Sequence, residues 1–412
     1  MRGVWTIAML LAGAALTNGC DDSSDGATGG DAAEGGGEQT GGAQAGGADT
    51  GGSGGASAEG GGPDQGGQGG GSSTGGAGEG GAGGAGEATI APSNAADFGL
   101  LQETGLEVGP PNGTFDTLFD CTASSVLGAC EIAPRTNLPD ACVCRSDRLT
   151  IGALRVEGPH ALVLLVYEEV SILGTLDLGA IGDEPGPGAA YTQSMETAGG
   201  GLGSAGGNDG SSHAFDSSLE PLVGGVSGGS SCNAAGGGGG GALQISAGHT
   251  ITVTGVISAG GGGGPGGPAN CAGTGGGSGG VILLEAPEVS MTGMLLANGG
   301  GGGGGGSLSY GGGYQGSDAL LSLDTAPGGQ GQDDHGCFAE TTFGGYGGSG
   351  AVAALDAADG AAGDSTSACF DTEWVRAGGG GGGLGAIRIN TSGGCVCAGD
   401  FSPEPSLGTI PL

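Results

Sequence analysis

The cysteines of this chain have the chemistry and spacing to form disulfide bonds or to bind a metal. The 412 residues include 11 cysteines. Cys20 stands apart, directly after an apolar N-terminal segment. The remaining even set in an exported chain favours a disulfide framework. The disulfide candidates are Cys121, Cys130, Cys142, Cys144, Cys232, Cys271, Cys337, Cys369, Cys395 and Cys397.

Distance along the sequence favours local pairing of these cysteines. Cys232 and Cys271 lie just outside two glycine runs that bracket one repeat. A bond from the first part of the fold to the last would span too far, so we expect the remaining cysteines to pair within each end. Each bridge would remove entropy from the unfolded chain. The expected pairs are Cys121–Cys130, Cys142–Cys144, Cys232–Cys271, Cys337–Cys369 and Cys395–Cys397.

The two C-x-C pairs also invite a metal interpretation, since thiolates bind zinc. A structural zinc site needs four ligands in tetrahedral array, usually two C-x-x-C pairs or cysteines with histidines. Neither a histidine nor a second C-x-x-C lies close in sequence to Cys142 or Cys395. We therefore expect no metal and no cofactor.

Hydrolytic chemistry has weak support in the sequence. Ser212, His213 and Asp216 stand near one another, but a catalytic triad is recognised by geometry and not by short spacing. Carbohydrate-active enzymes with a parallel β-helix gather carboxylates and basic residues on one strand face. Here the outward strand positions are mostly Ser, Thr, Gln and Asn, and lysine is absent. We expect no enzyme, although a cleft with converging carboxylates and an arginine would favour one.

A strand-bend-strand repeat must position most of these residues. From residue 236 to 264 the chain reads GGGGGGALQISAGHTITVTGVISAGGGGG. Leu243 and Ile245 fall on one side of an extended chain and Gln244 and Ser246 on the other, which is typical of half-buried strands. Further copies occur near residues 161–180, 280–298 and 384–403, beside the one at 241–260. Their aligned positions are Val170, Ile172, Gly174 and Leu176; Ile251, Val253, Gly255 and Ile257; Val289, Met291, Gly293 and Leu295; and Cys395, Cys397 and Gly399.

Repeats of this kind predict stacking, because one unit cannot bury its apolar face alone. The copies are unevenly spaced, which favours a parallel β-helix-like solenoid with long glycine-rich loops. A β-sandwich and a bundle of polyglycine helices are the alternatives. We expect the solenoid over residues 148–412, with strands beginning at Arg148, and a cysteine-containing cap over 91–147. The long insertions, 182–235 and 299–377, carry apolar anchors, which are Leu219, Leu222, Val223, Leu320, Leu321, Leu323, Phe343, Val352, Leu355 and Trp374.

Composition limits what the chain can bind. Glycine supplies 112 residues and the formal net charge is −36, with seven basic residues that are all arginine. Such a chain repels nucleic acid and anionic lipid surfaces. Much of it cannot contribute to a hydrophobic core.

The N-terminal segment predicts export and a lipid anchor. Residues 1–19 combine Arg2 with an apolar run too short to span a membrane, as in a signal peptide. Leu16-Thr17-Asn18-Gly19-Cys20 is similar to a lipobox, whose cysteine is acylated, except that leucine stands four residues before Cys20 instead of three. Residues 20–90 then form a low-complexity stretch without basic residues, which predicts a disordered tether.

The motifs together resemble a known group of proteins. CVCRSDRLTIGALRVEG, LEPLVGG, GGGGGGALQIS, GGSGGVILLEAP and GGGGGGLGAIRINT occur in this order. They resemble the glycine-rich exported lipoproteins of myxobacteria, loosely labelled PE-PGRS-like and without an established function. The resemblance implies an architecture and an address in the cell envelope. It implies no catalytic residues.

The expected function is a non-catalytic cell-envelope lipoprotein with a surface structural or adhesive role. The alternative is a carbohydrate-active enzyme on a β-helix scaffold. The expected partners are the lipid bilayer, through acylated Cys20, and surface glycans or other envelope proteins. The expected location is the outer membrane or cell surface of a Gram-negative bacterium.

Overall fold

The computed structural model describes residues 92–94, 105–118, 121, 126–193, 195–214, 216–307, 311–335, 341–363 and 376–410, and gives only the backbone for 333–335 and 341–343. These residues form an all-β fold with no helix among them. The larger sheet, sheet A, has 11 strands. They are β1 (Glu107–Val108), β3 (Ala129–Ala133), β4 (Ala141–Ile151), β6 (Ala161–Ile172), β10 (Ala242–Ala247), β11 (Thr250–Val253), β13 (Val281–Glu285), β14 (Glu288–Met291), β18 (Ala386–Asn390), β19 (Gly394–Cys397) and β21 (Ser406–Gly408).

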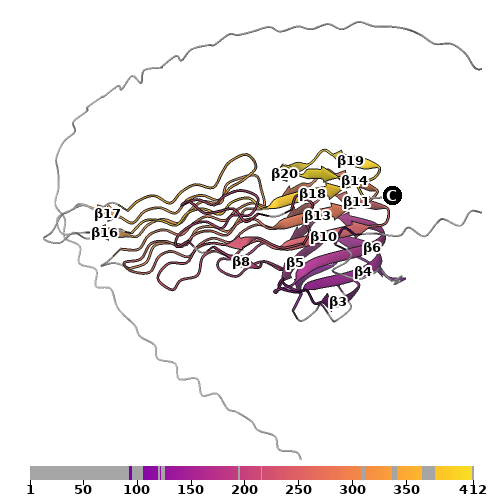
Figure 1. Ribbon diagram of the computed structural model, residues 1–412, viewed down its shortest axis with the longest axis horizontal. Coiled ribbons are helices and arrows are strands. Elements are labelled where there is room, and N and C mark those ends of the chain that lie inside the picture. The colour runs from indigo at the N-terminus through magenta and orange to yellow at the C-terminus, as the bar shows by residue number, and fades with distance from the viewer. Residues whose placement is uncertain are drawn as a thin grey trace, which may run out of the picture. The chain divides into compact units, whose positions relative to one another are not determined.

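A second sheet, sheet B, has six strands in the order β2-β5-β7-β12-β15-β20. Strand pairing in both sheets is parallel except between β3 and β4. Figure 1 shows the strands of sheet A lying side by side. The strands of sheet B are β2 (Asn112–Asp116), β5 (Ala153–Glu157), β7 (Thr175–Asp177), β12 (Val256–Ser258), β15 (Met294–Leu296) and β20 (Asp400–Ser402). Two small pairs complete the set, β8 (Tyr191–Thr192) with β9 (Val226–Ser227) and β16 (Asp333–His335) with β17 (Thr341–Phe343).

The four sequence repeats stack in the register that their alignment predicts. Ile251 pairs with Val170 on one side and with Val289 on the other. Val289 in turn pairs with Cys395. In sheet B, Ile257 lies between its aligned partners in the same way. The alternation of apolar residues thus fixes which residues are neighbours, because a slip by one position would turn every side chain to the other face.

The glycine at each bend is required by close stacking where the chain passes from sheet A to sheet B. A Cβ on Gly255 would overlap the backbone carbonyl of Gly174, and one on Gly293 would overlap that of Gly255. Gly399 continues the column above Gly293. Successive copies therefore touch backbone to backbone at this corner, which leaves no room for a side chain.

Apolar side chains fill the space between the two sheets. The cluster there contains Leu162 and Leu164 of β6, Leu243 and Ile245 of β10, and Phe115 of β2, all fully buried. It forms because β-strands direct alternate side chains to one face. This is the main hydrophobic core of the described residues.

The outer face of sheet A is buried as well along β10 and β13, which differs from the half-buried strands expected there. Gln244 and Ser246 both have no exposed surface. The 182–235 insertion covers this face, and its Leu219 and Leu222 belong to the same buried cluster as Leu283. An alternating strand pattern shows which side chains share a face, but it cannot show that a distant loop covers the polar one.

The first long strand also begins earlier than expected. β4 starts at Ala141 and pairs with β6 from there onward, instead of starting at Arg148. Cys142 and Cys144 take the inward positions, so the strand alternation extends through the C-x-C pair. Arg145 consequently lies on a strand too, as do Arg148, Arg155 and Arg388.

The glycine-rich segments beyond the sheet form a hydrogen-bonded array with a period of three residues. Every third N–H of residues 299–306 donates to the same neighbouring segment. Their carbonyls accept from residues of segments 261–267, 329–332 and 379–382, so six segments surround this one. Figure 1 shows such segments running side by side. The donor–acceptor pairs are Gly299–Ala351, Gly302–Gly348 and Gly305–Gly345 to one neighbour, Gly300–Gly277, Gly303–Thr274 and Gly306–Cys271 to the second, and Gly301–Ser317 and Gly304–Tyr314 to the third.

Some of the apolar anchors predicted in the insertions are buried and others are exposed. Leu219, Leu222, Val223 and Val352 are buried as expected. Phe343 is described only by its backbone, and Trp374 lies outside the described residues. Four residues are exposed against expectation, because the neighbouring glycine segments offer no side chains to pack against: Leu320, Leu321, Leu323 and Leu355.

Within the part of the chain that the structure describes, no helix is long and apolar enough to cross a membrane.

Candidate functional site

A cleft beside sheet B gathers charged side chains around Arg155. It is lined in part by Asp116, Arg155, Glu157 and Glu184, and its volume is about 190 Å³. The parallel register places Arg155 on β5 next to Asp177 on β7. Two adjacent strands therefore bring opposite charges to one point of the sheet.

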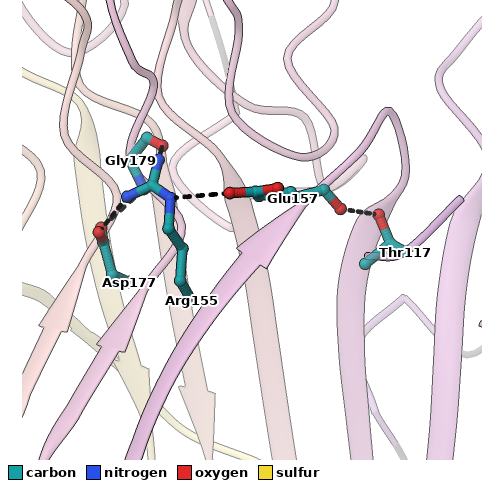
Figure 2. A network of polar contacts seen from close by, with 5 residues as sticks. All are labelled: Thr117, Arg155, Glu157, Asp177 and Gly179. Carbon is teal, nitrogen blue, oxygen red and sulfur yellow. Dashed lines mark hydrogen bonds and ion pairs between the residues drawn. The ribbon is translucent and has the colours of Figure 1, made fainter. Parts of the chain in front are cut away.

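Arg155 is held on several sides, as Figure 2 shows. Its Nη1 forms an ion pair with Asp177, its Nη2 donates to the carbonyl of Gly179 at 2.8 Å, and its Nε lies 3.3 Å from Glu157. The backbone N–H of Gly179 donates to the other oxygen of Asp177 at 2.9 Å. Thr117 adds a hydrogen bond to the carbonyl of Glu157. The guanidinium is thus occupied by groups of this chain.

The electrostatics of this cleft favour a structural role for the arginine. The Arg155 side chain is 27% exposed and that of Asp177 is 19% exposed, so their ion pair is partly shielded from water. Removal of either partner would leave the other charge partly buried and uncompensated, so each group is needed to balance the other. Asp116 accepts the N–H of Leu118 at 2.8 Å. Glu157 and Glu184 remain as the cleft's more accessible carboxylates.

A second polar cluster is buried on the outer face of sheet A around Glu285. The register places Ser246, Glu285 and Asn390 side by side on β10, β13 and β18. Glu285 is 2% exposed. Its carboxylate accepts five hydrogen bonds, from the Ser93 N–H at 3.2 Å and hydroxyl at 2.6 Å, the Gln244 amide at 2.8 Å, the Ser246 hydroxyl at 2.8 Å and the Asn390 amide at 3.0 Å.

Five hydrogen bonds from uncharged groups satisfy this carboxylate. Buried charges persist when enough hydrogen bonds replace the lost water. Asn94 extends the cluster by donating to Gln244 at 3.0 Å. Residues 92–94 are thereby joined to a sheet almost two hundred residues further along the chain. The arrangement supports a structural role, because the side chains of the cluster are bonded to one another.

The structure corrects the expected pairing of the cysteines near the N-terminal end. It joins Cys121 to Cys142 and Cys130 to Cys144, with Cα separations of 5.7 and 4.0 Å. Antiparallel pairing of β3 with β4 places Cys130 directly opposite Cys144. The predicted Cys121–Cys130 and Cys142–Cys144 bonds were wrong because sequence spacing does not show which strands pair.

The remaining described cysteines pair as predicted. Cys232 bonds to Cys271 across a Cα separation of 6.1 Å, and Cys395 bonds to Cys397 within β19. Cys20, Cys337 and Cys369 lie outside the described residues. The sulfur atoms of Cys130, Cys142 and Cys144 lie within 4.8 Å of one another. All three are in disulfides, however, and a disulfide sulfur is not the thiolate that binds metal.

The structure does not bring Ser212, His213 and Asp216 together as a triad. The His213 ring stacks on Tyr191, with ring centroids 4.3 Å apart. Asp216 accepts the backbone N–H of Ser218 at 2.9 Å, and this bond holds the pKa of the Asp216 carboxyl below its usual value. Among the described residues, no hydrogen bond joins the three side chains.

Two further acidic residues, Asp356 and Asp359, lie outside the strands. Asp359 accepts the backbone N–H of Asn208, and Asp356 is exposed. Asp333, Asp334 and His335 form β16, where only the backbone is described.

Sequence reasoning missed both polar clusters. Polar residues stand at one outward position in three repeats, namely Ser246, Glu285 and Asn390, and Gln244 holds the preceding outward position of its strand. This alignment was the signal in the sequence. For Arg155, the signal was the acidic residue at the aligned position of the next strand, Asp177.

Comparisons with known proteins give no further guide to this site. No family model, no curated protein and no solved structure matches the chain.

Proposed function

We propose that this chain is a non-catalytic structural or adhesive protein of the cell envelope. The observation that carries the proposal is the period-three hydrogen-bond array around residues 299–306. It joins many glycine segments through their backbones, which lie so close that a Cβ on any of residues 299–306 would overlap a neighbouring carbonyl. Such a construction provides a rigid support. Such rigidity suits a protein whose role is to hold or to attach.

The finer architecture in this proposal has two parts. The stacked repeats are a short parallel β-helix-like solenoid, in which each copy supplies strands to both sheets. The glycine segments are left-handed helices with three residues per turn, packed side by side as glycine permits. Support comes from the repeated register and from the φ angles of residues 299–306, none of which lies between +20° and +160°. The predicted solenoid would then describe the stacked repeats, and the alternative of polyglycine helices would describe the glycine segments.

The envelope location rests on the sequence. An export signal over residues 1–19, acylation at Cys20 and a tether over residues 20–90 would hold the folded part at a bilayer. The resemblance to glycine-rich exported lipoproteins supports the same location. The proposed partners are the bilayer, through the acyl chains, and surface glycans or envelope proteins.

Two measurements test the location and the role. Cys20→Ala should move the protein from the membrane fraction to the soluble fraction, because it removes the acylated residue. Cells lacking the protein should attach less well to surfaces or to one another, and the wild-type gene should restore attachment. Membrane retention of the variant would contradict the anchor. Unchanged attachment and an unchanged envelope would contradict the structural or adhesive role.

The cleft at Arg155 keeps a second candidate function open, that of a carbohydrate-active enzyme. Its carboxylates and arginine match the arrangement that would favour such an enzyme. Incubation with a polysaccharide panel, followed by a reducing-end assay, tests it. Activity abolished by Glu157→Gln and by Glu184→Gln, with folding intact, would support the enzyme. Turnover by neither the wild type nor the variants would support the non-catalytic role.

A further inference from the structure

Four neighbouring glycine-rich segments form an outer layer with side chains aligned in rows. The Tyr314 N–H donates to the Gln330 carbonyl at 2.8 Å, and the Ala361 N–H donates to the Tyr346 carbonyl at 2.7 Å. The Gly347 N–H donates to the Gly329 carbonyl. The two segments run in opposite directions, so residue 346 lies beside residue 330. Tyr314, Gln330, Tyr346 and Ala361 are therefore successive members of one row.

A second row follows three residues along each segment. Its bonds run from Ser317 to Pro327, at 2.9 Å, and from Ala358 to Ser349, at 2.9 Å. The repeat of the row after three residues reflects the period of the array. We call these two rows the tyrosine face: Tyr314, Gln330, Tyr346 and Ala361 with Ser317, Pro327, Ser349 and Ala358.

The tyrosine face is open on its outer side and supported beneath. Tyr314 is 60% exposed and Tyr346 is 51% exposed. On the inner side, the first three segments are bonded to the central segment, for example Gly304 to the Tyr314 carbonyl and Gly302 to the Gly348 carbonyl. The tyrosines are thus carried by a backbone network that fixes their spacing, so a ligand would meet a preorganised surface.

Chemistry narrows the class of ligand. None of the eight side chains of the tyrosine face carries a charge, whereas the chain as a whole has a formal charge of −36. Anionic polymers would be repelled by the surrounding molecule. Tyrosine offers an apolar ring with a polar hydroxyl, and glutamine offers an amide donor and acceptor. Rings that stack on sugars, beside an amide that bonds to hydroxyl groups, suit a neutral glycan.

The spacing agrees with this class. Hydrogen-bonded neighbouring chains lie about 4.8 Å apart, so the two segments that carry the tyrosines, two steps apart around the central segment, lie roughly 8–10 Å apart. This separation is comparable to the length of two sugar units in an extended polysaccharide. We propose that the tyrosine face binds a neutral polysaccharide, with Tyr314 and Tyr346 stacking on alternate sugars and Gln330 bonding between them. The proposal rests on the adhesive form of the proposed function and names its ligand.

Binding of the full chain to immobilised polysaccharides tests the proposal. The neutral probes are β-glucan, mannan and galactan, and the anionic probes are alginate and heparin. The wild type should bind at least one neutral probe and neither anionic one. The double variant Tyr314→Ala/Tyr346→Ala should bind at least tenfold more weakly. Tyr314→Phe/Tyr346→Phe keeps the rings and should retain most of the binding.

Leu173→Ala is the matched control, because Leu173 is also 57% exposed but lies at the turn between β6 and β7. It should bind as the wild type does. Neutral-glycan binding that survives the double alanine change would overturn the tyrosine face and leave the adhesive role standing. If the protein binds none of the neutral probes while cell attachment still depends on both tyrosines, the proposal is overturned. The tyrosine face would then bind a protein partner instead of a glycan. Loss of folding is checked by the unfolding transition, and the phenylalanine pair then decides the outcome.

Discussion

Single residues in this chain are constrained by backbone contact more than by side-chain packing. Gly303 shows the reason. It donates to Thr274 in one neighbour and accepts from Gly379 in another. A Cβ there would overlap the carbonyl of Pro265 in a third. Glycine is needed because the neighbouring backbones occupy the space of a side chain. This requirement outweighs the larger conformational entropy that glycine loses on folding.

We therefore expect Gly303→Ala to lower the free energy of unfolding by about 1–3 kcal/mol, as overpacking does elsewhere. Gly109→Ala is the control, since a Cβ at Gly109 meets nothing within 4 Å. The control should change stability by less than about 1 kcal/mol. Urea unfolding of both variants measures this. Equal stability of the two would show that the segments are not in close contact.

At the scale of elements, pairing between strands decides what the sequence spacing leaves open. β3 turns back on β4, whereas other neighbours in sheet A run parallel. This reversal brings Cys130 opposite Cys144, and Cys142 on the same face bonds to Cys121 instead. The two disulfides join the preceding segment to the first long strand, at an end of the stack where no earlier copy of the repeat covers the core.

Cys121→Ser should release a free thiol at Cys142. The local scheme expected from spacing would release it at Cys130 instead. Alkylation of the folded variant, followed by cleavage at Glu131, separates the two cysteines, and mass spectrometry then identifies the labelled one. Loss of the bridge should lower the free energy of unfolding by about 2–5 kcal/mol. A label on Cys130 would contradict the pairing.

At the scale of the whole molecule, distant parts of the chain are joined by polar contacts. Ser93 and Asn94 reach the outer face of sheet A through Glu285 and Gln244. The insertion that contains Leu219 and Leu222 covers the same face. Polar residues at outward strand positions thereby become buried and must be fully bonded, because an unsatisfied buried group destabilises the fold.

Glu285→Gln should lower the free energy of unfolding by about 1–3 kcal/mol, because an amide group replaces one acceptor oxygen among donors. Glu288→Gln is the matched control on the next strand, where the side chain is exposed, and should change stability by less than about 0.5 kcal/mol. Thermal and urea unfolding compare the two. A similar effect at both positions would show that Glu285 is accessible to water.

The sequence alone determined the repeats, their register and the bend glycines. Alternation of side chains has a period of two in a strand, so aligned copies could stack in only one way, and Ile251 and Val289 became neighbours as expected. The period of three was also present, since Tyr314 and Ser317, or Tyr346 and Ser349, stand three residues apart between glycines. These patterns are local, and local geometry is sufficient to predict them.

Tertiary structure alone decided which distant segments meet. The antiparallel return of β3, the cover over Gln244 and the burial of Glu285 depend on contacts between residues far apart in sequence. Glycine segments differ too little from one another for composition to show which will be neighbours. Their order follows from where the strands begin and end, because the stacked sheets fix the starting point of each segment and the backbone hydrogen bonds then hold the rest in place.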